Sequence, residues 1–250
     1  MLGHLAPGCP PVLWCTVTPP HHPAMPAAVL FDMDGTIVDT EPFWMRAETE
    51  LVAEYGGTWT HEQGLAMVGL GLWDSAAVLQ TAGVDLAADD IVSRLSSRVI
   101  EQFDEGLPWR PGARELLASV KEAGIPTALV TMSIRRMAEA VAAAIGFAGF
   151  DVIVPGDEVE YPKPHPAAYL RAAEFLGVDI TACVAVEDSV PGLASAVASG
   201  AATIVVPLQA TIEPDAAFTL WSSLEGRTVD DLRHVLSARV TAVETARVTA

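Results

Sequence analysis

The chain has 250 residues and a formal net charge of −18 at pH 7, from 14 Lys and Arg against 32 Asp and Glu. This length suffices for one domain with a large insertion or for two modest domains. The negative charge disfavours nucleic acid and anionic membrane surfaces as partners. The sequence has no run of about 18 apolar residues, so we expect no membrane anchor. Its three cysteines lack a metal-binding spacing and fit a reducing, cytoplasmic setting.

Short apolar runs alternate with helical patterns along most of the chain, which is typical of a parallel sheet covered on both faces. We therefore predict an α/β fold, a doubly wound, Rossmann-like sheet. The predicted strands lie near residues 27–31, 126–131, 150–154, 182–187 and 202–206. The predicted helices between them lie near 112–123, 134–145, 165–176 and 190–199.

The pattern also predicts how the chain divides. Residues 1–25 are rich in proline and are expected to form a disordered N-terminal extension. The segment 40–108 holds amphipathic stretches and no clear strand, so we interpret it as a helical cap inserted into the core. The core then comprises 26–39 and 109–236, and residues 237–250 are a tail or a helix.

The first predicted strand ends in Asp32 and Asp34, two carboxylates separated by Met33. Open α/β sheets bind ligands at the carboxyl ends of their strands, so this position suits an active site. The alternative is a plain turn in which the two side chains cap backbone N–H groups.

The second predicted strand is followed by Thr131 and Ser133, where hydroxyl and backbone donors could hold a phosphate at a helix N-terminus. Taken alone, these residues are more often simple caps. Farther along, Lys163 lies between two prolines, which restrict the backbone around its ammonium group. An isolated lysine is usually a solvated surface charge.

The predicted strand at 182–187 ends in Glu187 and is followed by Asp188, so acids follow two strands of one sheet. Carboxylates within about 4 Å repel by several kcal/mol at an effective dielectric constant of about 20, so a converging cluster requires a cation or a shared proton. Ligands that are all oxygens favour magnesium over zinc.

The DxDGT motif at 32–36, followed by Thr131, by Lys163 and by the Glu187-Asp188 pair, resembles the haloacid dehalogenase-like (HAD) hydrolase superfamily. The resemblance implies a magnesium-dependent enzyme that hydrolyses a small phosphate monoester through an aspartyl-phosphate. The expected partner is a small-molecule phosphate ester, with no nucleic acid and no membrane, and the expected assembly is a monomer or small homo-oligomer.

The resemblance also assigns roles. Asp32 would be the nucleophile, and Asp34 would protonate the leaving group and then activate water. Thr131 would hold the transferring phosphoryl group, and Lys163 would neutralise negative charge. The implied metal ligands are Asp32, Asp34, Glu187 and Asp188.

Within this superfamily, the stretch 32–44 and the stretch 161–166 are similar to bacterial phosphatases of 2-deoxyglucose 6-phosphate and hexitol phosphates. A sugar phosphate is therefore the expected substrate. Besides Ser133, the candidate substrate contacts are Glu41, the backbone N–H of Met132, and Arg135.

Three alternatives remain at this point. A mutase like β-phosphoglucomutase typically carries a histidine after the first motif and an arginine in the cap, whereas this chain has Trp44 and then Leu72 or Trp73. Dehalogenation is disfavoured because the dehalogenases typically lack an acid at the position of Asp34. A catalytically silent binding protein would keep the fold without the chemistry.

Overall fold

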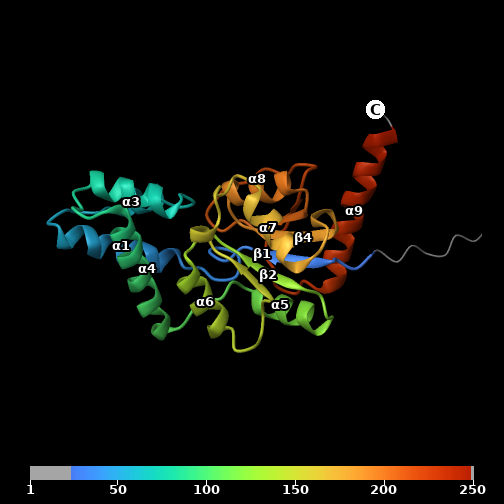
Figure 1. Cartoon of the computed structure of the whole chain (residues 1–250), viewed down its shortest axis with the longest axis horizontal. Helices are drawn as coiled ribbons and strands as arrows, with labels where there is room; N and C mark the ends of the chain where they lie inside the picture. Colours follow the sequence, from blue (N-terminus) through green and yellow to red (C-terminus); the bar gives the residue numbers. More distant parts are fainter. Residues whose placement is uncertain (1–23, 249–250) are drawn as a thin grey trace, which may run out of the picture.

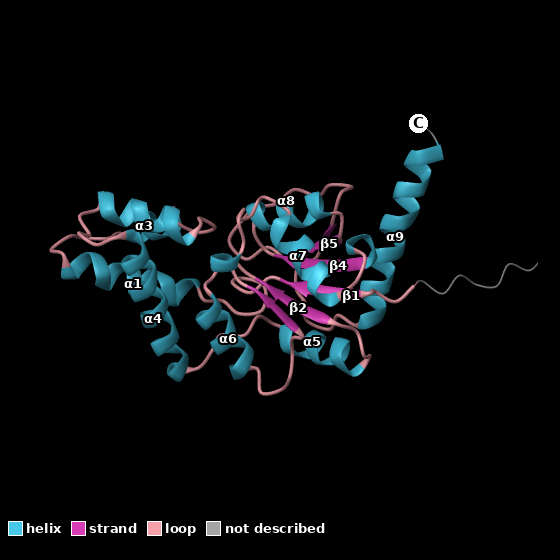
Figure 2. Cartoon of the chain, in the orientation of Figure 1, coloured by secondary structure: helices cyan, strands magenta, loops and turns pink. Residues whose placement is uncertain are grey.

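The computed structural model describes residues 24–248, and its centre is a six-stranded parallel sheet (Figures 1 and 2). The strands are β1 (Ala28–Phe31), β2 (Thr127–Val130), β3 (Val152–Val154), β4 (Cys183–Glu187), β5 (Ala202–Val205) and β6 (Thr219–Leu220). Their order in the sheet is β3-β2-β1-β4-β5-β6. Five strands agree with the sequence prediction to within two residues at each end. The sixth was not predicted because two residues carry no recognisable period.

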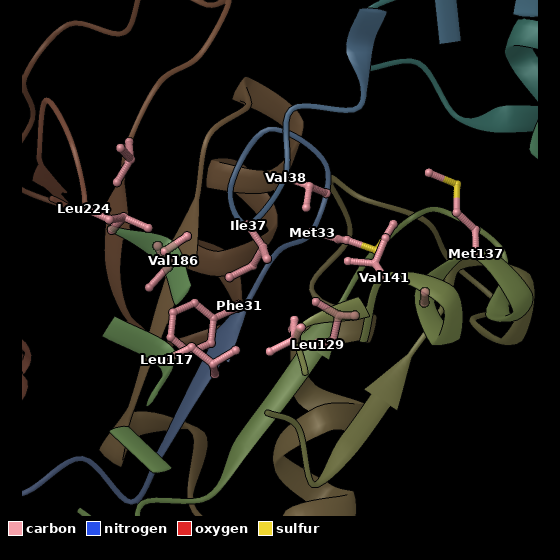
Figure 3. Packing of buried hydrophobic residues seen from close by; sticks show 14 of the residues in the cluster. Phe31, Met33, Ile37, Val38, Leu117, Leu129, Met137, Val141, Val186 and Leu224 are labelled. Atoms are coloured by element: carbon pink, nitrogen blue, oxygen red, sulfur yellow. The ribbon is translucent and has the colours of Figure 1, made fainter. Parts of the chain in front are cut away.

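Helices cover both faces of this sheet. They are α5 (Ala113–Glu122), α6 (Arg135–Ala144), α7 (Ala167–Leu176), α8 (Val190–Ser199) and α9 (Val229–Val248). Alternate residues of β1 face opposite sides. Val29 and Phe31 belong to the core cluster that includes buried residues of α5, α6 and α9, part of which is drawn in Figure 3. Ala28 and Leu30 belong to the cluster with α7 and α8. The expected doubly wound α/β fold is confirmed.

Between β1 and α5, all of the elements that the structure describes are helices or 3-10 turns. They are α1 (Glu41–Glu54), α2 (His61–Leu65), α3 (Leu72–Thr81), α4 (Ala88–Glu101) and the 3-10 turn η1 (Gln102–Glu105). Helix α4 buries Ile91, Leu95 and Val99, which recur every four residues and form one apolar face. Figure 1 shows α1, α3 and α4 as a lobe beside the sheet. We call residues 41–105 the cap segment; its independence as a domain stays a prediction.

The chain enters and leaves the cap segment at neighbouring points. Val38 forms an antiparallel bridge with Trp109. The N–H of Asp39 donates to the carbonyl of Pro108 at 2.9 Å, and that of Arg110 donates to the carbonyl of Ile37 at 2.9 Å. The two segments that connect the core to the cap segment, residues 37–39 and 108–110, are therefore hydrogen-bonded to each other.

The ends of the chain differ in how far the structure describes them. Helix α9 runs to Val248 and so crosses the predicted boundary at residues 236 and 237. Residues 1–23 of the expected N-terminal extension, and residues 249–250, lie outside the described residues. Among helices of the described part, none is long and apolar enough to cross a membrane.

Candidate active site

The loop after β1 places Asp32 and Asp34 on the same side of the chain. Asp32 continues the sheet, because its N–H donates to the carbonyl of Val186 at 2.9 Å. Met33 points to the apolar core and is fully buried. Gly35 has a φ of 89°, and a Cβ there would lie 2.1 Å from Oδ2 of Asp188. Only glycine lets the loop pass this close to the late acid.

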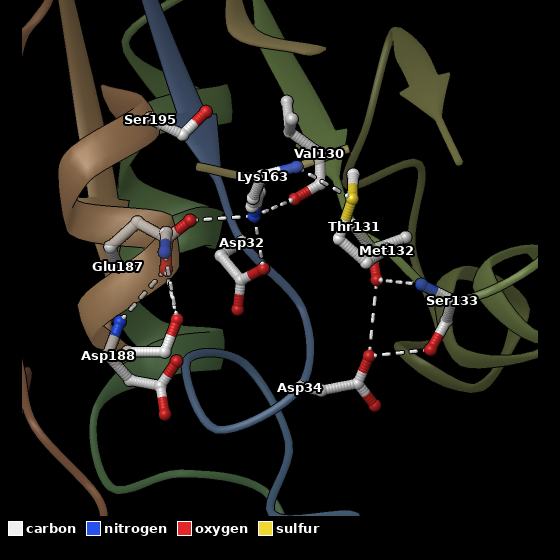
Figure 4. Close-up of polar contacts among 12 residues, drawn as sticks. Asp32, Asp34, Val130, Thr131, Met132, Ser133, Lys163, Glu187, Asp188 and Ser195 are labelled. Atoms are coloured by element: carbon white, nitrogen blue, oxygen red, sulfur yellow. Dashed lines mark hydrogen bonds and ion pairs between the residues drawn. The ribbon is translucent and has the colours of Figure 1, made fainter. Parts of the chain in front are cut away.

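The ammonium of Lys163 links the ends of three strands (Figure 4). It donates to Oδ1 of Asp32 at 2.7 Å, to Oε1 of Glu187 at 2.6 Å and to the carbonyl of Val130 at 3.0 Å. These bonds use all three of its protons. Burial acts to lower the pKa of Lys163, but the charges of Asp32 and Glu187 outweigh burial and raise that pKa. Lys163 is therefore a buried cation within the site.

Glu187 is also held by a residue that the sequence analysis did not single out. The hydroxyl of Tyr169, on α7, donates to its Oε1 at 2.5 Å. Burial and the charge of Glu187 raise the pKa of Tyr169 well above its usual value, so the phenol stays a donor. The only sequence signal for Tyr169 was its place on a helix that covers the sheet. Glu187 thus connects α7 to the lysine.

Asp32, Glu187 and Asp188 offer carboxylate oxygens that all lie within 4.8 Å of one another. Burial, and then the charge of Glu187, raise the pKa of Asp32 to about 7. Burial, and then the charge of Asp32, raise the pKa of Asp188 to about 9. Oδ2 of Asp32 is buried without a hydrogen-bond partner. An all-oxygen group with one unpaired buried oxygen fits a hard divalent cation.

The carboxylate of Asp34 lies outside that group and is surrounded by hydroxyls. Thr40 donates to its Oδ1 at 2.5 Å, while Thr131 at 3.1 Å and Ser133 at 2.7 Å donate to its Oδ2. Thr131 also accepts from the N–H of Ser133 at 3.0 Å. Three hydroxyls therefore fix the direction of the second acid, and Thr40 is one that the sequence analysis missed.

A cavity of about 180 Å³ opens over these groups, between the core and the cap segment. At about 30 Å³ per liquid water molecule, it has room for the reacting part of a small molecule. Asp32 and Asp34 line it, together with the predicted contacts Glu41, Met132 and Ser133.

The two arginines that follow Ser133 are engaged elsewhere. Arg135 does not line the cavity; its guanidinium pairs with Glu158, with a 2.7 Å bond from Nη2 to Oε2. It turns away because the 3-10 turn η2 (Gly156–Glu158) places acids beside the start of α6. Arg136 donates to Oγ of Ser97 at 2.8 Å and so joins α6 to α4.

Comparisons with known proteins agree with this arrangement. The family model described as haloacid dehalogenase-like hydrolase matches residues 26–200. Hexitol phosphatase B of Escherichia coli (strain K12) is 35% identical over 191 residues, which cover 72% of this chain and 83% of that protein. Phosphorylated carbohydrates phosphatase of Thermotoga maritima is 34% identical over 178 residues, covering 69% and 81%.

A solved structure is similar in both fold and sequence. CbbY from Rhodobacter sphaeroides, in complex with xylulose-(1,5)bisphosphate, superposes with a TM-score of 0.75 at 32% identity, covering 81% of this chain and 96% of that chain. The chain belongs to the haloacid dehalogenase-like hydrolases. Its enzyme class, a phosphoric monoester hydrolase, agrees with the sequence prediction.

Proposed function

We propose that the protein is a magnesium-dependent phosphatase that hydrolyses a sugar phosphate through an aspartyl-phosphate on Asp32. The observation that carries the proposal is the state of that carboxylate. One oxygen is held by Lys163 at 2.7 Å, and the other is buried, unpaired and directed among acids at the edge of the cavity. A carboxylate that is held by a lysine and lies beside a group of acids able to bind a cation is suited to attack phosphorus. The named phosphatase relatives support the choice of substrate class.

Asp32, Glu187 and Asp188 are the residues that would hold magnesium, and Asp34 lies next to them in the cavity. Bound magnesium would supply charge neutralisation for the phosphate oxygens and the acids. Glu187 is the most distant of the three from the cavity, because it is fully buried and already bonded to Lys163 and Tyr169.

The proton transfers fall to Asp34. As an oxygen of Asp32 bonds to phosphorus, the bond to the leaving alcohol breaks, and the protonated carboxyl of Asp34 gives its proton to that alcohol. The resulting carboxylate of Asp34 then takes a proton from water as the water oxygen bonds to phosphorus. The bond between phosphorus and Asp32 breaks in that step, which releases inorganic phosphate and restores the Asp32 carboxylate. Hydroxyls of Thr40, Thr131 and Ser133 hold Asp34 in position for both transfers.

The residues at the mutase positions favour hydrolysis. Trp44 and Leu72 line the cavity, and Trp73 is 42% exposed and donates its indole N–H to Asp89. These three side chains can neither accept a proton nor carry a positive charge, so they do not replace the histidine and arginine that are typical of the mutase.

The proposal is tested by p-nitrophenyl phosphate hydrolysis with and without magnesium, in wild type and in Asp32→Asn. We expect metal-dependent phosphate release that the substitution lowers by at least about 10³-fold. The exposed Asp215→Asn is the matched control and keeps wild-type activity. Trapping of phosphate on the chain by acid quench should disappear in Asp32→Asn. Undiminished turnover in that variant rules out the nucleophile.

A further inference from the structure

The wall of the cavity that the cap segment provides is acidic. Glu41 and Glu48 of α1 and Asp74 of α3 all line the cavity. Of the described residues that line it, Lys163 is the one Lys or Arg, and its three protons are already used in the core. A bound leaving group therefore meets carboxylates on the cap side without a compensating cation.

Glu48 is the most buried of these acids and has no part in the proposed chemistry. It is 5% exposed, and the indole N–H of Trp59 donates to its Oε2 at 3.2 Å. Among the residues that the structure describes, Trp59 is its one hydrogen-bond donor. Burial raises the pKa of Glu48 to about 7, the bond from Trp59 opposes this rise, and the charge of Glu41 adds to it.

A buried carboxylate with unused acceptor capacity is unfavourable until another donor reaches it. Glu48 lines the cavity, so a ligand can supply that donor. Sugar and polyol hydroxyls are donors of the required kind, whereas phosphate and carboxylate groups are anionic and would be repelled. The Trp59 bond fixes the direction of the acid before any ligand arrives.

We propose that Glu48, assisted by Glu41, makes the enzyme select leaving groups by charge: it binds hydroxyl groups of an uncharged sugar or polyol and rejects a second anionic group. This inference rests on the proposed function and concerns the same cavity. Two like charges about 6 Å apart at an effective dielectric constant of about 20 repel enough to weaken binding by about 100-fold. The wall also opposes mutase action, because an aspartyl-phosphate that transfers to a sugar phosphate yields a bisphosphate.

Glucitol 6-phosphate and 6-phosphogluconate test this selection, since they differ only in a hydroxymethyl group against a carboxylate at one end. Each is added as a competitor of p-nitrophenyl phosphate hydrolysis at pH 8, where Glu48 is ionised. In wild type, we expect the inhibition constant of 6-phosphogluconate to be about 100-fold higher than that of glucitol 6-phosphate. In Glu48→Gln the ratio should fall at least about tenfold, because the amide keeps an acceptor without the charge.

Glu50→Gln, an exposed change on the same helix, is the matched control and should keep the wild-type ratio. Glu41→Gln is the second variant and should also lower the ratio, so a folding defect in one variant does not decide the outcome. Equal inhibition by the two compounds in wild type, or an unchanged ratio in both variants, overturns the selection. If wild-type turnover of p-nitrophenyl phosphate does not depend on Asp32, the proposed function is overturned instead.

Discussion

The two walls of the cavity handle charge in opposite ways. On the core wall, Lys163 lies between Asp32 and Glu187 and is bonded to both. On the cap wall, Glu41 and Glu48 have raised pKa values, each near 7, and burial is the first cause for both. The acids of the core wall are paired with a cation before substrate arrives, while Glu48 on the cap wall has, within the described part of the chain, only the bond from Trp59 and can accept further donors from a ligand. We infer that reactivity resides in the core and selectivity in the cap segment.

Replacing Lys163, the cation of the core wall, is expected to have the largest effect on the difference between the two walls. Lys163→Met would leave Asp32 and Glu187 buried as unpaired acids, and we expect it to lower the free energy of unfolding by about 3–5 kcal/mol. Urea denaturation at pH 7.5 measures the change. Lys121→Met breaks a partly exposed pair with Asp151 and is expected to cost less than about 1 kcal/mol. Equal losses in the two variants would contradict a specially organised core wall.

Replacing the second acid separates chemistry from binding. Asp34→Asn cannot donate a proton, so we expect kcat to fall by about 100-fold for a sugar phosphate. The phosphorylation step with p-nitrophenyl phosphate should suffer less, because p-nitrophenolate leaves without needing a proton. Single-turnover rates with both substrates measure this. If Asp34→Asn lowers the rate of the phosphorylation step equally for both substrates, Asp34 only positions its neighbours and does not donate the proton.

The phenol of Tyr169 tests the support behind the core wall. Tyr169→Phe removes the bond to Glu187 but keeps the ring, and we expect a loss of about 2 kcal/mol in stability, since the acceptor is charged and buried. Thermal and urea denaturation measure the loss. Tyr161 is 50% exposed, and Tyr161→Phe should be nearly neutral. No difference between the two variants would mean that Glu187 does not need the phenol.

The smallest effect concerns the pH dependence of stability. Folding raises the pKa of Glu48 from 4.5 to about 7, so the folded protein binds the proton more tightly than the unfolded chain does. Its contribution favours folding below pH 4.5 and is lost as pH rises through about 7. Relative to wild type, Glu48→Gln should therefore gain about 1–2 kcal/mol in stability as the pH rises from 5 to 6.5. Urea denaturation across this range measures the gain; a constant difference would contradict the assigned pKa.

The sequence anticipates the groups that follow strands better than those on helices. Asp32, Thr131 and Asp188 were foreseen because parallel strands end at one edge of the sheet, where their following residues converge. Lys163 required the family resemblance, since its two flanking prolines alone do not distinguish it from a surface lysine. The structure brings it to 2.7 Å from Asp32, 131 positions away in the chain.

What escaped prediction depends on packing between distant elements. Tyr169 and Glu48 lie on helices whose apolar pattern predicts burial but not the partner that each meets. Arg135 shows the reverse case, in which a cation near the motif is drawn to Glu158, 23 residues farther along. The direction of the Arg135 side chain depends on the 3-10 turn η2, which no sequence pattern predicted.

The paired crossings at Val38 and Trp109 have a consequence for how such an enzyme can diversify. Because the chain leaves the sheet and returns to it at hydrogen-bonded neighbours, we predict that residues 41–105 can be exchanged for another segment without moving β1 or α5. Insertions are tolerated best where their ends lie close together. A new ligand preference can then be acquired by transplanting one contiguous stretch, while the phosphorus chemistry is inherited intact.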